Sequence, residues 1–145
     1  MQTATAGNIS RIEKKPTVAR VLVVDDEALI RWSLAETLAD HGCHVFEAAD
    51  AAEALTILGQ GPDAIDVVLL DLNLPDSADL SLLSAIRTIS PRATVVLMTA
   101  FGCEEVVREA LDLGAFRVIN KPFDLEDLSR LVAQALDPGH HRERH

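Results

Sequence analysis

Side chains able to hold a metal ion and a phosphoryl group follow four short apolar segments of the sequence. In chain order they are two aspartates, a third aspartate, a hydroxyl and an amine: Asp25 and Asp26, Asp71, Thr99 and Lys121. Two carboxylates about 4 Å apart repel each other by roughly 4 kcal/mol at an effective dielectric constant near 20, and one lysine cannot neutralise three of them. A hard divalent cation can, and a site with few protein carboxylates suits Mg²⁺, which keeps water ligands and accepts a phosphate oxygen.

This combination of groups indicates phosphoryl chemistry. We predict a Mg²⁺ site with an aspartate nucleophile, and with a hydroxyl and a lysine that can contact the remaining phosphoryl oxygens. In the alternative interpretation the three aspartates are ordinary helix caps at strand-to-helix turns. Taken singly, Thr99 would be a turn residue and Lys121 a solvated surface charge. Their functional interpretation depends on the whole set.

The elements that must position these side chains alternate along the chain. Five short runs rich in β-branched residues have the composition of buried parallel strands, at positions 21–24, 44–46, 67–70, 94–98 and 118–119. Five other segments carry apolar residues at helical spacing, near positions 30–38, 51–58, 83–89, 106–111 and 125–132. Asp50 and Asp124 are placed to cap two of these helices, and Gly42 and Gly114 to end two others.

The alternation predicts one doubly wound α/β domain with a five-stranded parallel sheet, five helices and right-handed crossovers. Strand order does not follow from the pattern alone. Ligands of such sheets bind beyond the carboxyl ends of the strands, and the acidic, hydroxyl and amine side chains all fall there. We therefore expect these distant residues to meet at one edge of the sheet.

Four segments resemble the signature motifs of the receiver domain of two-component response regulators, which is a chemotaxis-regulator-like domain. They occur in the family's order and spacing and are Val-Val-Asp-Asp-Glu at 23–27, Leu-Asp-Leu-Asn-Leu-Pro at 70–75, Met-Thr-Ala at 98–100 and Asn-Lys-Pro-Phe at 120–123. The resemblance covers roughly residues 20–136. It implies a flavodoxin-like fold with strand order 2-1-3-4-5. It also implies a signalling domain that assists only its own phosphorylation and dephosphorylation, and is not otherwise an enzyme.

The resemblance implies a role for each matching acidic residue. Asp71 would accept a phosphoryl group from a phosphohistidine on a sensor histidine kinase or phosphotransfer protein. Mg²⁺ would be held by Asp26, by Asp25 directly or through water, by Asp71 itself and by the backbone carbonyl of Asn73.

The same resemblance assigns the hydroxyl and the amine. Lys121 would pair with one phosphoryl oxygen, and Thr99 would move to hydrogen-bond another. The Lys121–Pro122 peptide bond is expected to be cis in such proteins. The change of conformation would control a downstream output partner or a fused effector domain.

Two positions depart from the family pattern. Receivers usually carry Tyr or Phe three residues before the lysine, but this position is Val118, and Phe116 lies two residues earlier. Because Val cannot swing between buried and exposed rotamers, either Phe116 replaces the usual ring or backbone shifts at 101–114 carry the switch. We expect activation to remodel the fourth helix. Where many receivers have Gly, eight residues after Asp71, this chain has Asp79, which predicts a differently shaped loop.

Composition limits the other functions. The formal net charge of −10 would repel phosphate backbones, so no direct nucleic-acid binding is expected. There is no apolar run of membrane-spanning length, no secretion signal, and no cysteine besides Cys43 and Cys103, which favours the cytoplasm and no membrane contact. We expect a flexible leader at residues 1–19, the receiver domain at 20–137 and a tail at 138–145.

Some side chains outside the motifs have both an ordinary and a functional interpretation. Trp32, the single tryptophan, is expected to pack in or beside the core rather than act as a docking anchor, although the family's first helix contributes to the kinase-facing surface. Cys103, near the start of the fourth helix, is expected to be a small packed side chain rather than a redox group. His140, His141 and His145 are expected to be solvated.

The leading function is a receiver that relays histidine-kinase signals. It could be a stand-alone regulator or the N-terminal domain of a longer protein, such as a nitrogen-regulator-type activator, and it could form homodimers through its last helices and strand. The competing class is a Mg²⁺-dependent phosphatase or phosphotransferase with an aspartyl intermediate. Haloacid-dehalogenase-type enzymes usually have Asp-x-Asp, whereas Asp71-Leu72-Asn73 lacks the second acid. A nucleotide binder is disfavoured because no Gly-rich phosphate loop follows the first strand.

Overall fold

Strands and helices alternate through the part of the chain that the structure describes. A computed structural model describes residues 18–61, 64–77, 79–100 and 102–137. Its strands are β1 (Arg20–Val24), β2 (His44–Ala48), β3 (Val67–Asp71), β4 (Thr94–Thr99) and β5 (Arg117–Asn120). Its helices are α2 (Ala28–Asp40), α3 (Ala51–Gly59), α4 (Ser81–Ile89), α5 (Glu104–Asp112) and α6 (Leu125–Ala135). Every expected strand and helix is present, with ends within a few residues of those expected.

The five strands form one parallel sheet in the order β2-β1-β3-β4-β5. This confirms the order that the family resemblance implied. All residues of β3 and β4 are buried, as the apolar composition of these segments predicted, because helices cover both faces of the sheet. The edge strands β2 and β5 are exposed or partly covered, apart from the buried Ala48 at the end of β2.

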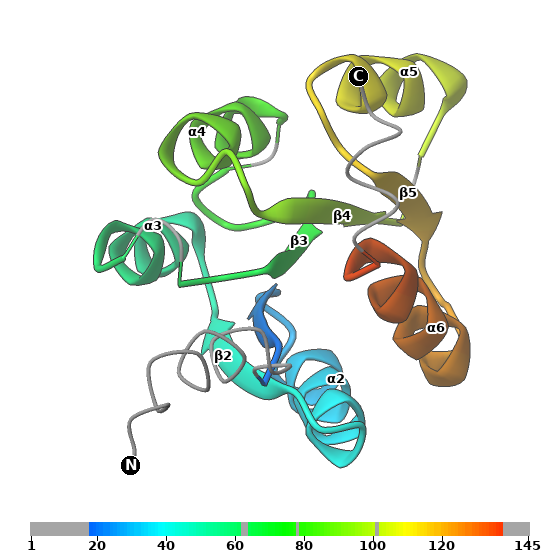
Figure 1. Cartoon of the computed structure of the whole chain (residues 1–145). Coiled ribbons are helices and arrows are strands. Elements are labelled where there is room, and N and C mark those ends of the chain that lie inside the picture. Colours follow the sequence, from blue (N-terminus) through cyan, green and yellow to red (C-terminus); the bar gives the residue numbers. More distant parts are fainter. Residues whose placement is uncertain (1–17, 62–63, 78, 101, 138–145) are drawn as a thin grey trace, which may run out of the picture.

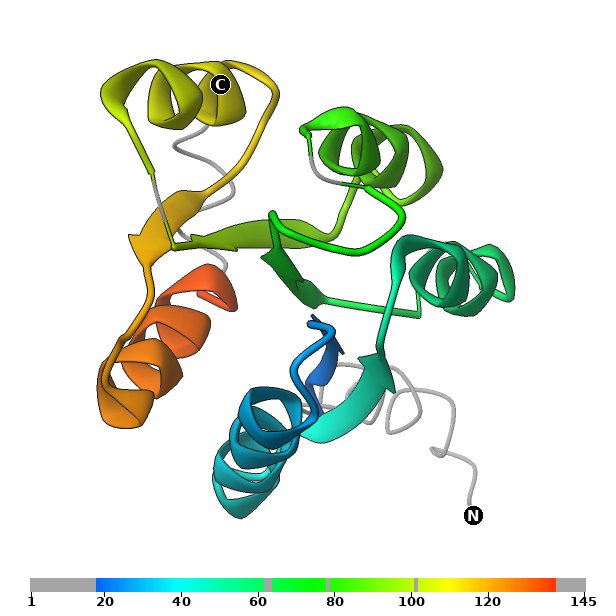
Figure 2. The same ribbon diagram turned by 180° about the vertical axis from the view of Figure 1, so that it is seen from behind.

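Helices α2 and α6 cover one face of the sheet, and α3, α4 and α5 cover the other (Figures 1 and 2). The first layer packs Leu34 and Leu38 of α2 beside Leu128 and Val132 of α6. The second layer packs residues of the other three helices on the opposite side of the strands, among them Leu58, Leu83, Ile86 and Ala110. Each strand therefore contributes alternate side chains to two separate apolar clusters.

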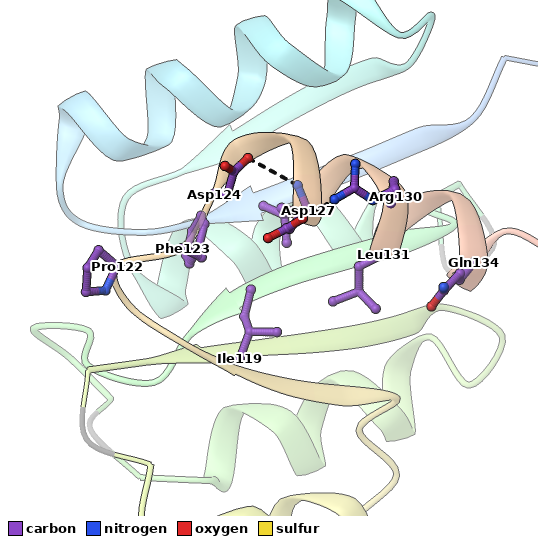
Figure 3. A pocket seen from close by; sticks show the side chains of 9 residues that line it. Ile119, Pro122, Phe123, Asp124, Asp127, Arg130, Leu131 and Gln134 are labelled. Carbon is purple, nitrogen blue, oxygen red and sulfur yellow. Dashed lines mark hydrogen bonds and ion pairs between the residues drawn. The ribbon is translucent and has the colours of Figure 1, made fainter.

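Capping side chains begin two of the helices where the sequence predicts. Asp50 accepts a hydrogen bond from the amide of Glu53 at 2.8 Å, and Asp124 accepts one from the amide of Glu126 at 2.7 Å. Figure 3 shows the Asp124 carboxylate at the first turn of α6. Gly42 and Gly114 follow their helices with φ of 91° and 106°, values that non-glycine residues rarely adopt.

Three side chains differ from the expectation drawn from sequence. Trp32 is 57% exposed on α2, so the prediction that it packs in or beside the core is wrong. Cys103 is exposed at the N-cap of α5, so the prediction of a packed side chain there is also wrong. Leu111 belongs to the helical apolar pattern but is 46% exposed, because only Ala110 of this helix is fully covered by the sheet.

Some expectations fall outside the described residues. They are the leader up to residue 17, the tail from 138 with His140, His141 and His145, and the backbone at Phe101. Among the helices that are described, none has the length and apolar character that crossing a membrane requires.

Candidate functional site

The strand register brings the residues predicted from sequence to one edge of the sheet. Asp71 pairs with Met98 as the last residue of β3, and Thr99 pairs with Asn120 at the ends of β4 and β5. Asp25 follows directly after Val24, which pairs with Leu70. Carboxylate oxygens of Asp25, Asp26 and Asp71 consequently lie within 4.8 Å of one another.

Asp25 is held from several sides and is fully buried. Its backbone amide donates to the carbonyl oxygen of Ala48 at 3.0 Å, and its carboxylate Oδ1 accepts from the amide of Glu27 at 2.9 Å. Arg31 of α2 donates from Nη1 to the Asp25 carbonyl oxygen at 2.6 Å, and its Nε lies 3.2 Å from Glu47. These contacts fix the acidic turn between β1 and α2.

Asp71 is 3% exposed at the end of β3. Its Oδ1 accepts a hydrogen bond from the amide of Asn73 at 3.1 Å, and its Oδ2 lies 3.3 Å from Lys121 Nζ. Burial raises the pKa of Asp71 to about 6 and the charge of Asp25 adds to the rise, while the Asn73 amide and Lys121 oppose it. The carboxylate is therefore a stronger base than an exposed aspartate and has one oxygen held by a backbone amide.

Lys121 is the cation of the site, and it contacts three acids. Its Nζ lies 2.8 Å from Asp25, 3.1 Å from Glu27 and 3.3 Å from Asp71. Burial alone would lower its pKa, but the contacts with Asp25 and Glu27 outweigh burial and raise the pKa. The amine is therefore charged throughout the neutral range. The Lys121–Pro122 bond is cis, as expected.

Glu27 is a member of the site that the sequence argument left without a role. It is 58% exposed at its side chain, yet it pairs with Lys121 across 94 residues of sequence. The sequence signal was its position directly after the aspartate pair, at the turn into α2. Its carboxylate competes with Asp71 for the same ammonium group.

The acidic side chains and the hollow beside them fit a divalent cation. The hollow has a volume of about 260 Å³ and is lined by Asp26, Glu27, Asp71, Asn73, Ala100 and Lys121. Asp25 Oδ2 is buried without a hydrogen bond of good geometry, although Lys121 lies near it. An all-oxygen donor set of this kind, with three carboxylates close to a single ammonium group, suits Mg²⁺.

Thr99 ends β4 and directly precedes Ala100, which lines the hollow. It is 1% exposed, and its carbonyl oxygen accepts a hydrogen bond from the Lys121 amide at 2.8 Å. Gly102 packs over it so closely that a methyl group there would lie 2.8 Å from Thr99 Cγ2 and 2.9 Å from Asn120 Oδ1. The loop after β4 therefore rests directly on the hydroxyl-bearing residue.

Val118, at the position expected for an aromatic switch, and Phe116, its possible replacement, lie on opposite faces of the sheet. Val118 is half-buried against the cluster beneath α3, α4 and α5. Phe116 is 6% exposed and packs in the opposite cluster, beneath α2 and α6. Phe116 is therefore on the wrong face of the sheet to replace the ring that receivers usually carry at Val118.

The loop after Asp71 carries Asp79 where many receivers have Gly. No described residue other than glycine has positive φ, so Asp79 does not adopt the backbone of the Gly that it replaces. Its Oδ1 instead accepts hydrogen bonds from the amide and the hydroxyl of Ser81, at 3.0 and 2.6 Å. This contact begins α4.

Residues 21–133 match the family profile described as Response regulator receiver domain. The chain belongs to the response regulator receiver family. Receivers are signalling domains, and those of this family typically bind Mg²⁺ at an acidic site such as the one formed by Asp25, Asp26 and Asp71. Phosphorylation on aspartate agrees with this membership, and an independent phosphatase is not favoured.

This receiver is similar in sequence to two kinds of characterised protein. It is 32% identical over 117 residues to sporulation initiation phosphotransferase F of Bacillus subtilis, covering 81% of this chain and 93% of that protein. It is 36% identical over 126 residues to the DNA-binding transcriptional regulator NtrC of Escherichia coli, covering 86% of this chain but 26% of NtrC. The chain thus spans nearly all of one relative and about a quarter of the other.

Solved receiver structures have the same fold. A CheY-like receiver protein from Methanospirillum hungatei superposes with a TM-score of 0.81 at 28% identity, covering 87% of this chain and 99% of that one. The receiver domain of NtrX from Brucella abortus superposes with a TM-score of 0.73 at 35% identity, covering 81% and 98%. The flavodoxin-like fold and the strand order are therefore those of the family.

The close packing of Gly102 predicts that a methyl group there is costly. We expect Gly102→Ala to lower the free energy of unfolding by about 1–3 kcal/mol, because Thr99 and Asn120 must move, and to shift their amide resonances. Gly59→Ala is the control, since no atom lies within 4 Å of the added methyl. Urea unfolding and heteronuclear NMR measure both effects. Equal stability of the two variants would contradict the packing argument.

The raised pKa of Asp71 predicts how stability depends on pH without metal. Below the ordinary aspartate pKa of about 4, Asp71 is protonated in both the folded and the unfolded state. As pH rises through about 6, the buried carboxyl must ionise, and the folded state loses stability relative to the unfolded state. In chelator, we expect the free energy of unfolding of Asp71→Asn to exceed that of the wild type by about 1–2 kcal/mol at pH 8, after allowance for screening. At pH 4 the two free energies should be equal. Urea unfolding at several pH values measures this difference. A difference independent of pH would show that Asp71 has an ordinary pKa.

Proposed function

We propose that this chain accepts a phosphoryl group on Asp71, with Mg²⁺ bound, from a histidine kinase or phosphotransfer protein. The observation that carries the proposal is the position of the Asp71 carboxylate, which is nearly buried, 3.3 Å from Lys121 and within 4.8 Å of the other two aspartates. One oxygen is held by the Asn73 amide, and the other faces the amine. A carboxylate in this position is oriented for attack on phosphorus.

The residues of the site have distinct proposed roles. Asp25, Asp26, Asp71 and the backbone carbonyl of Asn73 would hold Mg²⁺, which supplies charge neutralisation for the phosphoryl oxygens. In the transfer, an Asp71 oxygen forms a bond to phosphorus as the bond between phosphorus and the donor nitrogen breaks. The donor imidazole leaves with the electron pair of that bond.

Two further side chains would stabilise the transferred group. Lys121 exchanges part of its contact with Asp71 and Glu27 for a phosphoryl oxygen, which its permanent charge favours. The Thr99 hydroxyl moves to bond another oxygen. Because Gly102 lies directly on Thr99, this movement shifts the loop that leads into α5. Signal output through that loop and α5 does not require a ring at position 118.

A groove beside the site is the proposed docking surface for the phosphodonor protein. It has a volume of about 540 Å³, and its apolar residues come from α2, from the loop before α6 and from the first residue of α6: Leu29, Ile30, Pro122, Phe123 and Leu125. Glu27, Ala100 and Lys121 line both this groove and the acidic hollow. A partner helix in the groove would bring its histidine to Asp71. The exposed Leu29 and Trp32 extend the same apolar surface of α2.

The wider context of the chain is also a proposal. Similarity to NtrC supports a fused output domain, and similarity to sporulation initiation phosphotransferase F supports a receiver that acts by protein contact. Homodimerisation would use β5 and α6, where Ile119 and Leu131 line a hollow of about 450 Å³ (Figure 3). The two free cysteines support residence in the reducing cytoplasm.

Phosphorylation by a small donor tests the acceptor directly. With Mg²⁺ and acetyl phosphate, we expect base-labile phosphate on Asp71, none in Asp71→Asn, and a strongly reduced rate in chelator. Asp112→Asn, an exposed acid at the end of α5, is the control and keeps the wild-type rate. Mass spectrometry of the intact chain and of its peptides measures the modification. Labelling of Asp71→Asn at the wild-type rate would refute the assignment.

A substitution in the groove separates docking from chemistry. We expect Leu29→Ser to lower kcat/KM for transfer from a phosphorylated histidine kinase about tenfold, since burying a leucine contributes about 1.5 kcal/mol. Its rate with acetyl phosphate stays unchanged. Leu111→Ser, on the exposed face of α5, is the matched control. Equal effects of the two substitutions on kinase transfer would place docking elsewhere.

A further inference from the structure

The loop that follows Asp71 is tied to a distant helix by one carboxylate. Asp76 Oδ1 accepts a hydrogen bond from the amide of Ala51 at 2.8 Å, and Asp76 Oδ2 accepts one from the amide of Ala52 at 3.1 Å. These amides are the first two of α3, 25 and 24 residues earlier in the chain. The contact therefore spans two separate elements.

The two amides would otherwise lack partners. The first amides of an α-helix have no carbonyl within the helix to bond. In α3 the third amide, that of Glu53, is bonded by Asp50, and the fourth, that of Ala54, reaches the Asp50 carbonyl oxygen at 3.1 Å. Asp76 accepts hydrogen bonds from the remaining two amides, those of Ala51 and Ala52. These hydrogen bonds also lower the pKa of Asp76, so the carboxylate stays charged well below neutral pH.

The tied segment is short and internally bonded. At its start, the Leu72 amide donates to the Met98 carbonyl oxygen at 2.8 Å. Leu74 and Ser77 exchange two backbone hydrogen bonds of 3.2 and 3.3 Å, which closes a turn around Asp76. The segment 72–77 is therefore anchored to β4 at one end and to α3 at the other. Asn73, between the two anchors, lines the acidic hollow.

We propose that Asp76 is a positioning residue for the metal-binding loop and couples ion binding to the start of α3. The inference rests on the proposed function, because it requires the Asn73 carbonyl to be a ligand. A loop released from α3 would have to order itself each time the ion binds, and this ordering weakens binding. Reciprocity requires that a bound ion also strengthens the contact of Asp76 with the Ala51 and Ala52 amides.

Matched alanine variants of the whole chain test whether the contact between Asp76 and α3 supports ion binding. Asp76→Ala and Asp50→Ala each remove one negative charge and one cap from the same end of α3, but only the first releases the loop. We expect the dissociation constant for Mg²⁺, measured by NMR titration, to rise about tenfold in Asp76→Ala and less than about twofold in Asp50→Ala. Equal effects of the two substitutions, or none, would overturn the inference.

Hydrogen exchange in the unmodified chain gives a test that needs no variant. Saturating Mg²⁺ should slow exchange of the Ala51 and Ala52 amides about fivefold or more. The Glu126 and Asp127 amides of α6, capped within their own helix by Asp124, are the control and should not change. No slowing at Ala51 and Ala52 in a chain that binds Mg²⁺ refutes the coupling alone. Absence of Mg²⁺ binding at the aspartates refutes the proposed function instead.

Discussion

Two buried carboxylates share one ammonium group at the carboxyl edge of the sheet, and the site depends on this arrangement. Asp25 and Asp71 are nearly removed from water, and Lys121 lies 2.8 Å from the first and 3.3 Å from the second. With Asp26 close by, the negative charges still outnumber the positive one. Burial makes this imbalance costly, which explains both the raised pKa of Asp71 and the affinity expected for a divalent cation.

The rigid sheet holds these carboxylates close together despite their repulsion. Strands β1, β3 and β4 are covered on both faces, and their register puts Asp25, Asp71 and Thr99 at the same edge. The backbone at these positions cannot leave the edge of the sheet without breaking hydrogen bonds between strands. The freedom needed for switching therefore lies in side-chain rotation at the strand ends and in the loops that follow the strands.

Those loops differ in how they are restrained. The loop after β3 is tied to α3 through Asp76, and the loop after β4 lies against Thr99 because Gly102 has no side chain. In the proposed function, the first restraint would hold a metal ligand in place, and the second would transmit movement of Thr99 toward α5. Val118 has no ring and Phe116 faces the opposite cluster, so neither supplies the ring that receivers usually carry at position 118.

The helices and strands, and the residues that gather at the acidic site, could be predicted from the sequence. Its β-branched runs, helical stripes and caps at Asp50 and Asp124 are local patterns, and the motifs around Asp25, Asp71, Thr99 and Lys121 fixed both family and topology. Tertiary structure alone decided the contacts between elements: Glu27 with Lys121, Asp76 with α3, and the exposure of Trp32 and Cys103. Local patterns show which face of a helix is apolar. They do not show which residues the neighbouring elements cover in the folded chain. Ion pairs and caps across 25 or 94 residues depend on where the folded backbone brings the chain, which no single segment encodes.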